Sequence, residues 1–125
     1  MILFLDDDRN RAALAYQRWP KEKVNNTMWV ETAADAIEIL KGYADCLEEA
    51  HLDHDLGGEH YVDSRREDTG MEVVRYLERI SEEELKKFES TKFIVHSWNT
   101  YAGKHMAERL QKLGLSAIYR PFGLS

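Results

Sequence analysis

Two short acidic stretches hold the residues of this sequence that are best suited to chemistry. In "MILFLDDDRNR" an apolar run leads directly into Asp6, Asp7 and Asp8, and in "HLDHDLGG" a histidine separates Asp53 from Asp55. Carboxylates a few ångströms apart raise one another's pKa, so these groups cannot share one cleft as bare anions. A hard divalent cation, Mg²⁺ or Mn²⁺, would resolve the repulsion because both ions prefer oxygen ligands. If the two stretches meet in space, they predict a divalent metal site.

Some residues of these stretches also have a purely structural interpretation. Asp8 precedes a predicted helix, where a carboxylate commonly caps the N-terminus, and we expect that role for it. Asp55 is equally suited to capping the turn at Gly57 and Gly58 and to a place in the site. His54 alternates with the two acids, so it should face the opposite side of the chain and be structural. His51 is expected to be a bystander.

Polar residues also follow two further apolar runs. "KFIVHSWN" places His96, Ser97 and Asn99 after one run, and "SAIYRPFG" places Arg120 after the other. Nearby acids would favour the protonated form of His96, which makes it a candidate general acid. Arg120 offers a planar fork for phosphate oxygens, although it could instead pair with an aspartate. Ser97 and Asn99 are candidates for binding phosphate oxygens, with helix capping as the alternative.

A long polar segment, residues 57–69, follows the second acidic stretch. Polar loops at an active edge often act as lids. Within this segment, Arg65 and Arg66 are candidates for clamping a nucleotide phosphate, and Tyr61 is a candidate for stacking on a base. The alternative is a solvated loop without a role in binding.

The elements that must position these residues follow from the hydrophobic periodicity. Short apolar runs alternate with segments in which apolar residues recur at helical spacing. The predicted strands lie at 2–5, 28–32, about 49–54, within 92–99 and from 116 to Pro121; the predicted helices lie at about 9–19, from Thr32 onward, 70–80 and 101–113, with a helical turn at 81–84. This alternation predicts an α/β fold with a parallel sheet and helices on both faces. Ligands of such sheets bind at the carboxyl ends of the strands, which is where the polar candidates lie.

Composition and charge narrow the classes of function. The 125 residues suffice for one domain, and 43% hydrophobic with 32% charged residues is an ordinary globular composition. The formal net charge of −6 argues against broad binding to a nucleic-acid backbone, and no DNA-binding surface is evident, but a small nucleotide held by a metal and a few arginines is compatible with it. The single cysteine, Cys46, favours a cytoplasmic setting, and no apolar run approaches the roughly 20 residues that span a membrane.

These residues give the sequence a resemblance to the receiver domain of two-component response regulators, over nearly all of residues 1–125. The resemblance implies a doubly wound, five-stranded parallel sheet of the flavodoxin-like type with helices on both faces. It implies that Asp6 and Asp7 are the acidic pair that holds magnesium and that Asp53 is the phospho-acceptor. Ser97 would be the hydroxyl residue after the fourth strand, and Arg120 would stand where the family has a lysine.

The departures from ordinary receivers resemble one variant group, the cyclic-phosphate processing receiver domains. Arginine replaces lysine, "GG" replaces the usual Met-Pro, and seventeen positions separate Asp53 from Gly70. The variant group shares "LDDDR", "LDHDLG", "DTG" and "HSWN" with this sequence, followed here by Gly103 and Met106. This resemblance implies action on cyclic phosphates of RNA ends or of nucleotides.

The function predicted from these residues is a metal-dependent phosphoesterase reaction on the 2′,3′-cyclic phosphate of an RNA end or on a cyclic nucleotide, with Mg²⁺ or Mn²⁺ held by Asp6, Asp7 and Asp53. His96 would protonate the leaving oxygen, and Arg120 would stabilise charge on the phosphoryl oxygens, as would Ser97. Asp55 or Asp53 would position the attacking water. Two alternatives stay open: a signalling module phosphorylated on Asp53, and a module that binds a cyclic nucleotide without turnover.

Overall fold

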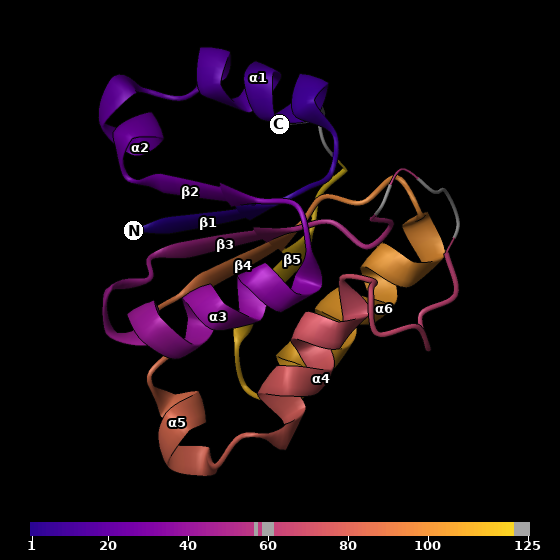
Figure 1. Cartoon of the computed structure of the whole chain (residues 1–125). Coiled ribbons are helices and arrows are strands. Elements are labelled where there is room, and N and C mark those ends of the chain that lie inside the picture. Colours follow the sequence, from indigo (N-terminus) through magenta and orange to yellow (C-terminus); the bar gives the residue numbers. More distant parts are fainter. Residues whose placement is uncertain (57, 59–61, 122–125) are drawn as a thin grey trace.

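Five short strands form an all-parallel sheet in the computed structural model, which describes residues 1–56, 58 and 62–121 (Figure 1). The strands are β1 (Ile2–Leu5), β2 (Thr27–Val30), β3 (Glu49–Leu52), β4 (Lys92–Val95) and β5 (Ser116–Tyr119), and their order in the sheet is β2-β1-β3-β4-β5. From β1 the chain passes to β2 on one side and then returns to β3 on the other, so the strand order reverses beside β1. The predicted fold class is confirmed.

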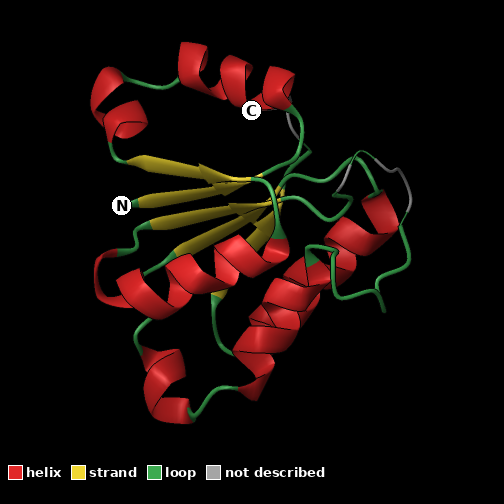
Figure 2. Cartoon of the chain, viewed as in Figure 1, coloured by secondary structure: helices red, strands yellow, loops and turns green. Residues whose placement is uncertain are grey.

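The helices are distributed unequally over the two faces of the sheet. They are α1 (Arg9–Arg18), α2 (Lys21–Asn25), α3 (Ala33–Tyr43), α4 (Met71–Arg79), α5 (Glu82–Lys86) and α6 (Thr100–Lys112), with a 3₁₀ turn η1 (Ala44–Cys46). Figure 2 shows α1 and α2 on one side of the sheet and the longer helices α3, α4 and α6 on the other. The periodicity does not predict α2 or η1, because helices this short contain no full apolar repeat. None of the helices in the described ranges is long and apolar enough to span a membrane.

The core lies mainly on the α3 face of the sheet. There Leu5, Leu52 and Val95, one from each of the three central strands, are fully buried. On the α1 face only β1 is fully covered, because Phe4 packs against Ala12 and Ala15 of α1. The strands β3, β4 and β5 instead alternate between a buried and a more exposed residue, so no helix of residues 1–56, 58 and 62–121 covers their α1 face.

Candidate functional site

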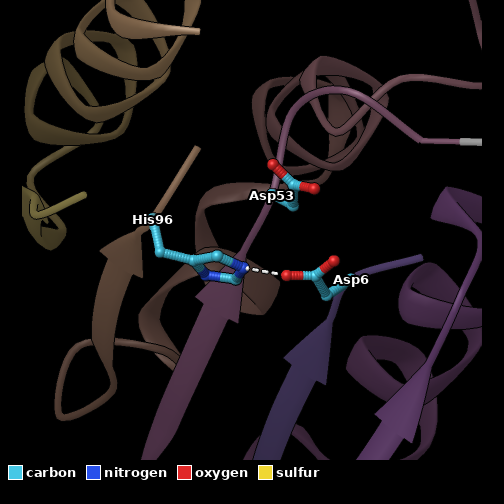
Figure 3. A group of neighbouring side chains, drawn as sticks. All are labelled: Asp6, Asp53 and His96. Atoms are coloured by element: carbon cyan, nitrogen blue, oxygen red, sulfur yellow. Dashed lines mark hydrogen bonds and ion pairs between the residues drawn. The ribbon is translucent and has the colours of Figure 1, made fainter. Parts of the chain in front are cut away.

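Three buried polar residues directly follow the three central strands. In the sheet register Leu5 lies beside Leu52, and Leu52 lies beside Val95. The next residues, Asp6, Asp53 and His96, therefore meet at the carboxyl edge, where at most 3% of each is exposed (Figure 3). One potential ligand atom from each of them lies within 4.8 Å of the other two, the one such group found among the described residues. The carboxyl edge thus brings the two acidic stretches and the histidine together.

Asp6 is the centre of the hydrogen bonds at this edge. Its Oδ2 accepts from Nε2 of His96 at 2.9 Å and from Nε of Arg11 at 2.7 Å. Its Oδ1 accepts from Nη2 of Arg11 at 2.9 Å and from the backbone N–H of Asp8 at 2.8 Å. Burial by itself would raise the pKa of Asp6, but the bonds from His96 and Arg11 outweigh burial and leave this pKa below its ordinary value. Asp6 is therefore an ionised and fully bonded carboxylate.

Asp53 has fewer hydrogen bonds than Asp6, and burial has the larger effect on its pKa. Its Oδ1 accepts from the backbone N–H of His54 at 2.8 Å, and its Oδ2 accepts from Nη2 of Arg11 at 3.1 Å. Burial raises the pKa of Asp53 to about 7, and the neighbouring charge of Asp6 adds to this, in spite of the opposing charges of His96 and Arg11. Asp53 is thus the carboxyl group of the edge whose protonation changes near neutral pH.

Gly70 fixes the position of Asp53 from the other side. A Cβ at this position would lie 1.8 Å from the backbone oxygen of Asp53. The N–H of Gly70 also donates to the backbone oxygen of His54 at 2.9 Å. The glycine of the "DTG" motif therefore lets the start of α4 approach the chain that carries Asp53.

Arg11 is the residue of the site that the sequence analysis missed. Its Nη2 lies 2.9 Å from Asp6, 3.1 Å from Asp53 and 3.8 Å from the nearest carboxylate oxygen of Asp7. This nitrogen is therefore surrounded by the three carboxylates predicted to hold a metal. The available signal was the position of Arg11 in the first turn of α1, three residues after Asp8, which caps that helix as predicted. Arg11 neutralises the clustered acids, which shows that the site accommodates positive charge.

Asp7 itself lies at the periphery of the cluster. It is absent from the group of close ligand atoms, and its carboxylate accepts a hydrogen bond from the backbone N–H of Gly58. The three carboxylates around Arg11 would make an all-oxygen donor set suited to Mg²⁺ or Mn²⁺, whereas the group of close ligand atoms holds Asp6, Asp53 and His96. A divalent ion and Nη2 of Arg11 would compete for these oxygens.

His96 is held in one orientation by two contacts. Its ring stacks on Phe4, with the ring centroids 5.2 Å apart and the planes 2° from parallel. Its Nε2 is bonded to Asp6. The imidazole is therefore oriented by two residues of the first acidic stretch: Phe4 contacts the face of the ring, and Asp6 binds its Nε2.

The remaining polar candidates are divided between two hollows. The first, here the edge pocket, has a volume of about 300 Å³ and is lined by Asp7, Arg11, Asp53, Asp55 and Ser97, among others. The second, here the sheet-face groove, has a volume of about 670 Å³ and runs along the part of the α1 face that no described helix covers. His96 and Arg120 line the groove and not the edge pocket. Arg120 lies on the α1 face, one residue beyond Tyr119 of the opposite face, whereas Ser97 lines the edge pocket.

Ser97, Asn99 and Asp55 are connected to each other. Oγ of Ser97 accepts from the backbone N–H of Asn99 at 3.1 Å. Asn99 caps α6 by accepting from the N–H of Ala102, and its Nδ2 lies 3.3 Å from Oδ1 of Asp55. Asp55 also accepts from Nδ1 of His54 at 2.6 Å. The capping alternative for Asn99 is therefore present, while Ser97 and Asp55 still face the edge pocket.

The loop arginines are not brought to the site. Arg65 pairs with Asp63, and Arg66 pairs with Asp68, each through two guanidinium nitrogens. Neither arginine lines the edge pocket. In both pairs the aspartate is two residues away in the chain, so the guanidinium groups of the predicted phosphate clamp are engaged locally in this structure. Tyr61, the predicted stacking residue, lies outside the described residues.

Comparisons with known proteins bear on the family and the fold of the chain. A family model described as the cyclic-phosphate processing receiver domain matches residues 1–112. No curated protein matches the chain. Among solved structures, the signal receiver domain of a protein described as a Luxo repressor from Vibrio parahaemolyticus is similar, with a TM-score of 0.58 and 18% sequence identity over 98% of this chain and 79% of that one. At this identity the likeness concerns the fold alone.

Proposed function

The chain belongs to the family of cyclic-phosphate processing receiver domains, and on this premise we propose that it opens the ring of a 2′,3′-cyclic phosphate at the carboxyl edge. The observation that carries the proposal is the contact between Nε2 of His96 and Asp6, 2.9 Å long, beside the buried carboxyl group of Asp53. It places a proton carrier, oriented by a carboxylate, next to a cluster suited to a cation.

Ring opening requires few groups. A water oxygen forms a bond to phosphorus, one of the two ring P–O bonds breaks, and the ribose oxygen that leaves takes up a proton. His96 would supply this proton in its imidazolium form, which Asp6 stabilises by accepting from Nε2. Asp55, held by His54 and Asn99 at the edge pocket, would orient the water and accept its proton. The product is a phosphate monoester.

Asp6, Asp7 and Asp53 would hold Mg²⁺ or Mn²⁺, because their oxygens already surround one positive nitrogen of Arg11. When bound, such an ion supplies positive charge to the phosphoryl oxygens. Arg11 would have to turn away from the carboxylates to admit it. Ser97 would face the phosphoryl group from the edge pocket and Arg120 from the groove.

The test is a turnover assay on 2′,3′-cyclic nucleotides and on RNA with a 2′,3′-cyclic phosphate end, with Mg²⁺ or Mn²⁺ and with chelator. We expect metal-dependent ring opening that falls at least about 100-fold in His96→Ala, as is usual for loss of a general acid, and in Asp53→Asn. His105→Ala and Asp45→Asn change exposed residues of the same types and should retain activity. Asp53→Asn should also lose its Mn²⁺ affinity. Absence of turnover in the wild type, or equal damage from the two histidine variants, would contradict the proposal.

A second candidate function follows from the receiver fold. Asp53 lies at the end of the central strand β3, where receivers carry their phospho-acceptor, and the edge pocket reaches it. Incubation with acetyl phosphate and intact-mass measurement separates the two functions. A stable phosphate on Asp53 without ring opening would favour a signalling module.

A further inference from the structure

His54 is a fully buried residue of the second acidic stretch, and its ring bridges two parts of the chain. Nδ1 of His54 lies 2.6 Å from Oδ1 of Asp55, and Nε2 lies 2.8 Å from Oγ of Ser64. The alternation of residues 53–55 predicts only a structural role for this ring, and no step of the proposed reaction uses it. A buried imidazole with a polar partner at each nitrogen nevertheless fixes where those two partners lie.

The contact with Asp55 determines which ring nitrogen of His54 carries a hydrogen. Asp55 is ionised when it serves as the base of the proposed reaction, and an ionised carboxylate can only accept a hydrogen bond. Nδ1 is therefore the donor to Asp55. Nε2 meets the hydroxyl group of Ser64, which can either donate or accept and so adapts to the ring. The Ser64 contact thus holds the imidazole in place without competing for its Nδ1–H.

Three donors converge on Oδ1 of Asp55, and His54 is the nearest of them. The backbone N–H of Val62 donates to this oxygen at 3.1 Å, and Nδ2 of Asn99 lies 3.3 Å from it. Both distances exceed the 2.6 Å of the His54 contact, and hydrogen bonds weaken as they lengthen. His54 therefore contributes most to the orientation of Asp55, whose side chain lines the edge pocket.

Ser64 is itself held by an arginine of α4. Nη1 of Arg75 donates to the backbone oxygen of Ser64 at 2.6 Å, and Nη2 of Arg75 donates to the backbone oxygen of Arg66 at 2.8 Å. Nε of Arg75 is bonded to Glu72 of the same helix at 2.6 Å, which fixes the guanidinium group. Ser64 is thus bound through its backbone to α4 and through its side chain to the buried imidazole.

We propose that His54 is a positioning residue for ring opening and that Ser64 holds its ring in place. This rests on the proposed function, in which Asp55 orients the attacking water. His54 acts through Asp55: its Nδ1–H fixes the carboxylate at the edge pocket, so that the water is already oriented when the substrate binds. The polar segment 62–69 then supports the general base, through the hydroxyl group of Ser64 and the N–H of Val62.

The test compares two amides at position 54. The amide nitrogen of asparagine takes the place of Nδ1, so His54→Asn keeps a donor to Asp55, whereas that of glutamine takes the place of Nε2, so His54→Gln keeps only the partner of Ser64. Turnover of a 2′,3′-cyclic nucleotide with Mn²⁺ is measured over a range of substrate concentrations. We expect kcat to fall about 10- to 100-fold in His54→Gln and at most about threefold in His54→Asn, with KM unchanged in both. A ring that only fills space would favour glutamine, the larger side chain.

Ser64→Ala tests the same proposal at a half-buried position, where the fold does not depend on the substitution of a buried ring. It removes the hydroxyl group but leaves the backbone oxygen that binds Arg75, and kcat should fall about 3- to 10-fold at unchanged KM. In His54→Asn, which has no group at the place of Nε2, the same substitution should have no further effect. Ser90→Ala removes an exposed hydroxyl group before β4, and His105→Gln changes an exposed histidine of α6; both should retain the wild-type kcat.

Equal kcat values in His54→Asn and His54→Gln would overturn the positioning role, as would a wild-type kcat in Ser64→Ala. In either case ring opening by the wild type shows that the proposed function stands and that only the role of His54 is refuted. Absence of ring opening in the wild type contradicts the proposed function, and the positioning role with it. Urea denaturation checks that each variant is folded. If both variants at position 54 are unfolded, Ser64→Ala decides the question.

Discussion

The edge pocket and the sheet-face groove meet at the same strand ends but differ in how their charged residues are paired. In the edge pocket Arg11 lies against three carboxylates, so the cation of the site is supplied by the protein itself. In the groove three exposed cations, Arg18, Lys92 and Arg120, have no ionic partner among the described residues. The carboxylates of the edge pocket are therefore already neutralised by Arg11, which a metal would have to displace, whereas the described cations of the groove are exposed. His96 lies between them, bonded to Asp6 and lining the groove.

Of the substitutions considered, Gly70→Ala should destabilise the protein most. Its Cβ would lie 1.8 Å from the backbone oxygen of Asp53, so the chain that carries Asp53 has to shift. We expect a loss of about 4 kcal/mol in the free energy of unfolding, the range of exceptional single substitutions, measured by urea denaturation.

Gly42→Ala is the matched control, because a Cβ there meets nothing within 4 Å inside α3. It should stabilise the protein by about 0.5–1 kcal/mol, since alanine favours the helix. Similar losses in both variants would mean that Gly70 does not hold Asp53 in place.

Arg11→Gln tests whether the guanidinium group of Arg11 neutralises the carboxylates of the edge pocket. It leaves Asp6 and Asp53 buried without their guanidinium partner, and breaking a buried ion pair from one side costs about 3–5 kcal/mol. In chelator the melting temperature should fall sharply. Mn²⁺ should restore it and should bind Arg11→Gln more tightly than the wild type, as titration calorimetry would detect.

Arg109→Gln removes an arginine from an ion pair with Glu78 that lies far from the edge. It should cost less than about 1 kcal/mol, and Mn²⁺ should not reverse the loss. If Mn²⁺ fails to rescue Arg11→Gln, the carboxylates are a structural ion pair and the metal site is refuted.

The two regions should also respond oppositely to pH. The raised pKa of Asp53, about 7, means that the folded protein binds a proton that the unfolded chain has already lost. Stability from this group is present below its unfolded pKa and is lost as the pH rises through about 7, a change of about 2 kcal/mol between pH 5 and pH 8 in chelator. Asp53→Asn should remove that decline.

Glu49, in the groove, has a lowered pKa, so its contribution to stability should depend on pH in the opposite direction and be smaller. Its hydrogen bond from His51 lowers its pKa to about 2, so its contribution is present at neutral pH and is lost as the pH falls from about 4 toward 2. Glu49→Gln should cost less than about 1 kcal/mol at pH 7, because the group is partly exposed. Melting curves from pH 3 to pH 8 would check both signs. A wild-type profile that rises from pH 5 to pH 8 would contradict the first.

Much of the fold could be predicted from the sequence, because it depends on local patterns. The apolar run of β1, the cap at Asp8 and the helical stripes each involve a few consecutive residues, and their alternation leaves one sheet type. The convergence of Asp6, Asp53 and His96 was also accessible, because parallel strands end at a common edge.

The distribution of the helices over the two faces of the sheet could not be predicted from the sequence in the same way. The polar residues Glu49, Lys92 and Ser116 were a signal that no described helix packs on their part of the α1 face, but this signal acquires its meaning only when the strands are aligned. The local pairing of the loop arginines was also not predicted. Arg65 and Arg66 each form an ion pair with an aspartate two residues away, which the positions of the charges in the sequence permit but do not require.

The sequence by itself determined which side chains reach the carboxyl edge, since that follows from where each strand ends. Only the tertiary structure decided what they do to one another there. Arg11 comes from a helix whose orientation over β1 places its guanidinium between Asp6 and Asp53, segments more than 40 residues apart in the chain. The direction of Arg120 and the position of the groove likewise depend on which face each residue occupies. Distances across the sheet set the electrostatic energies, and no spacing along the sequence encodes them.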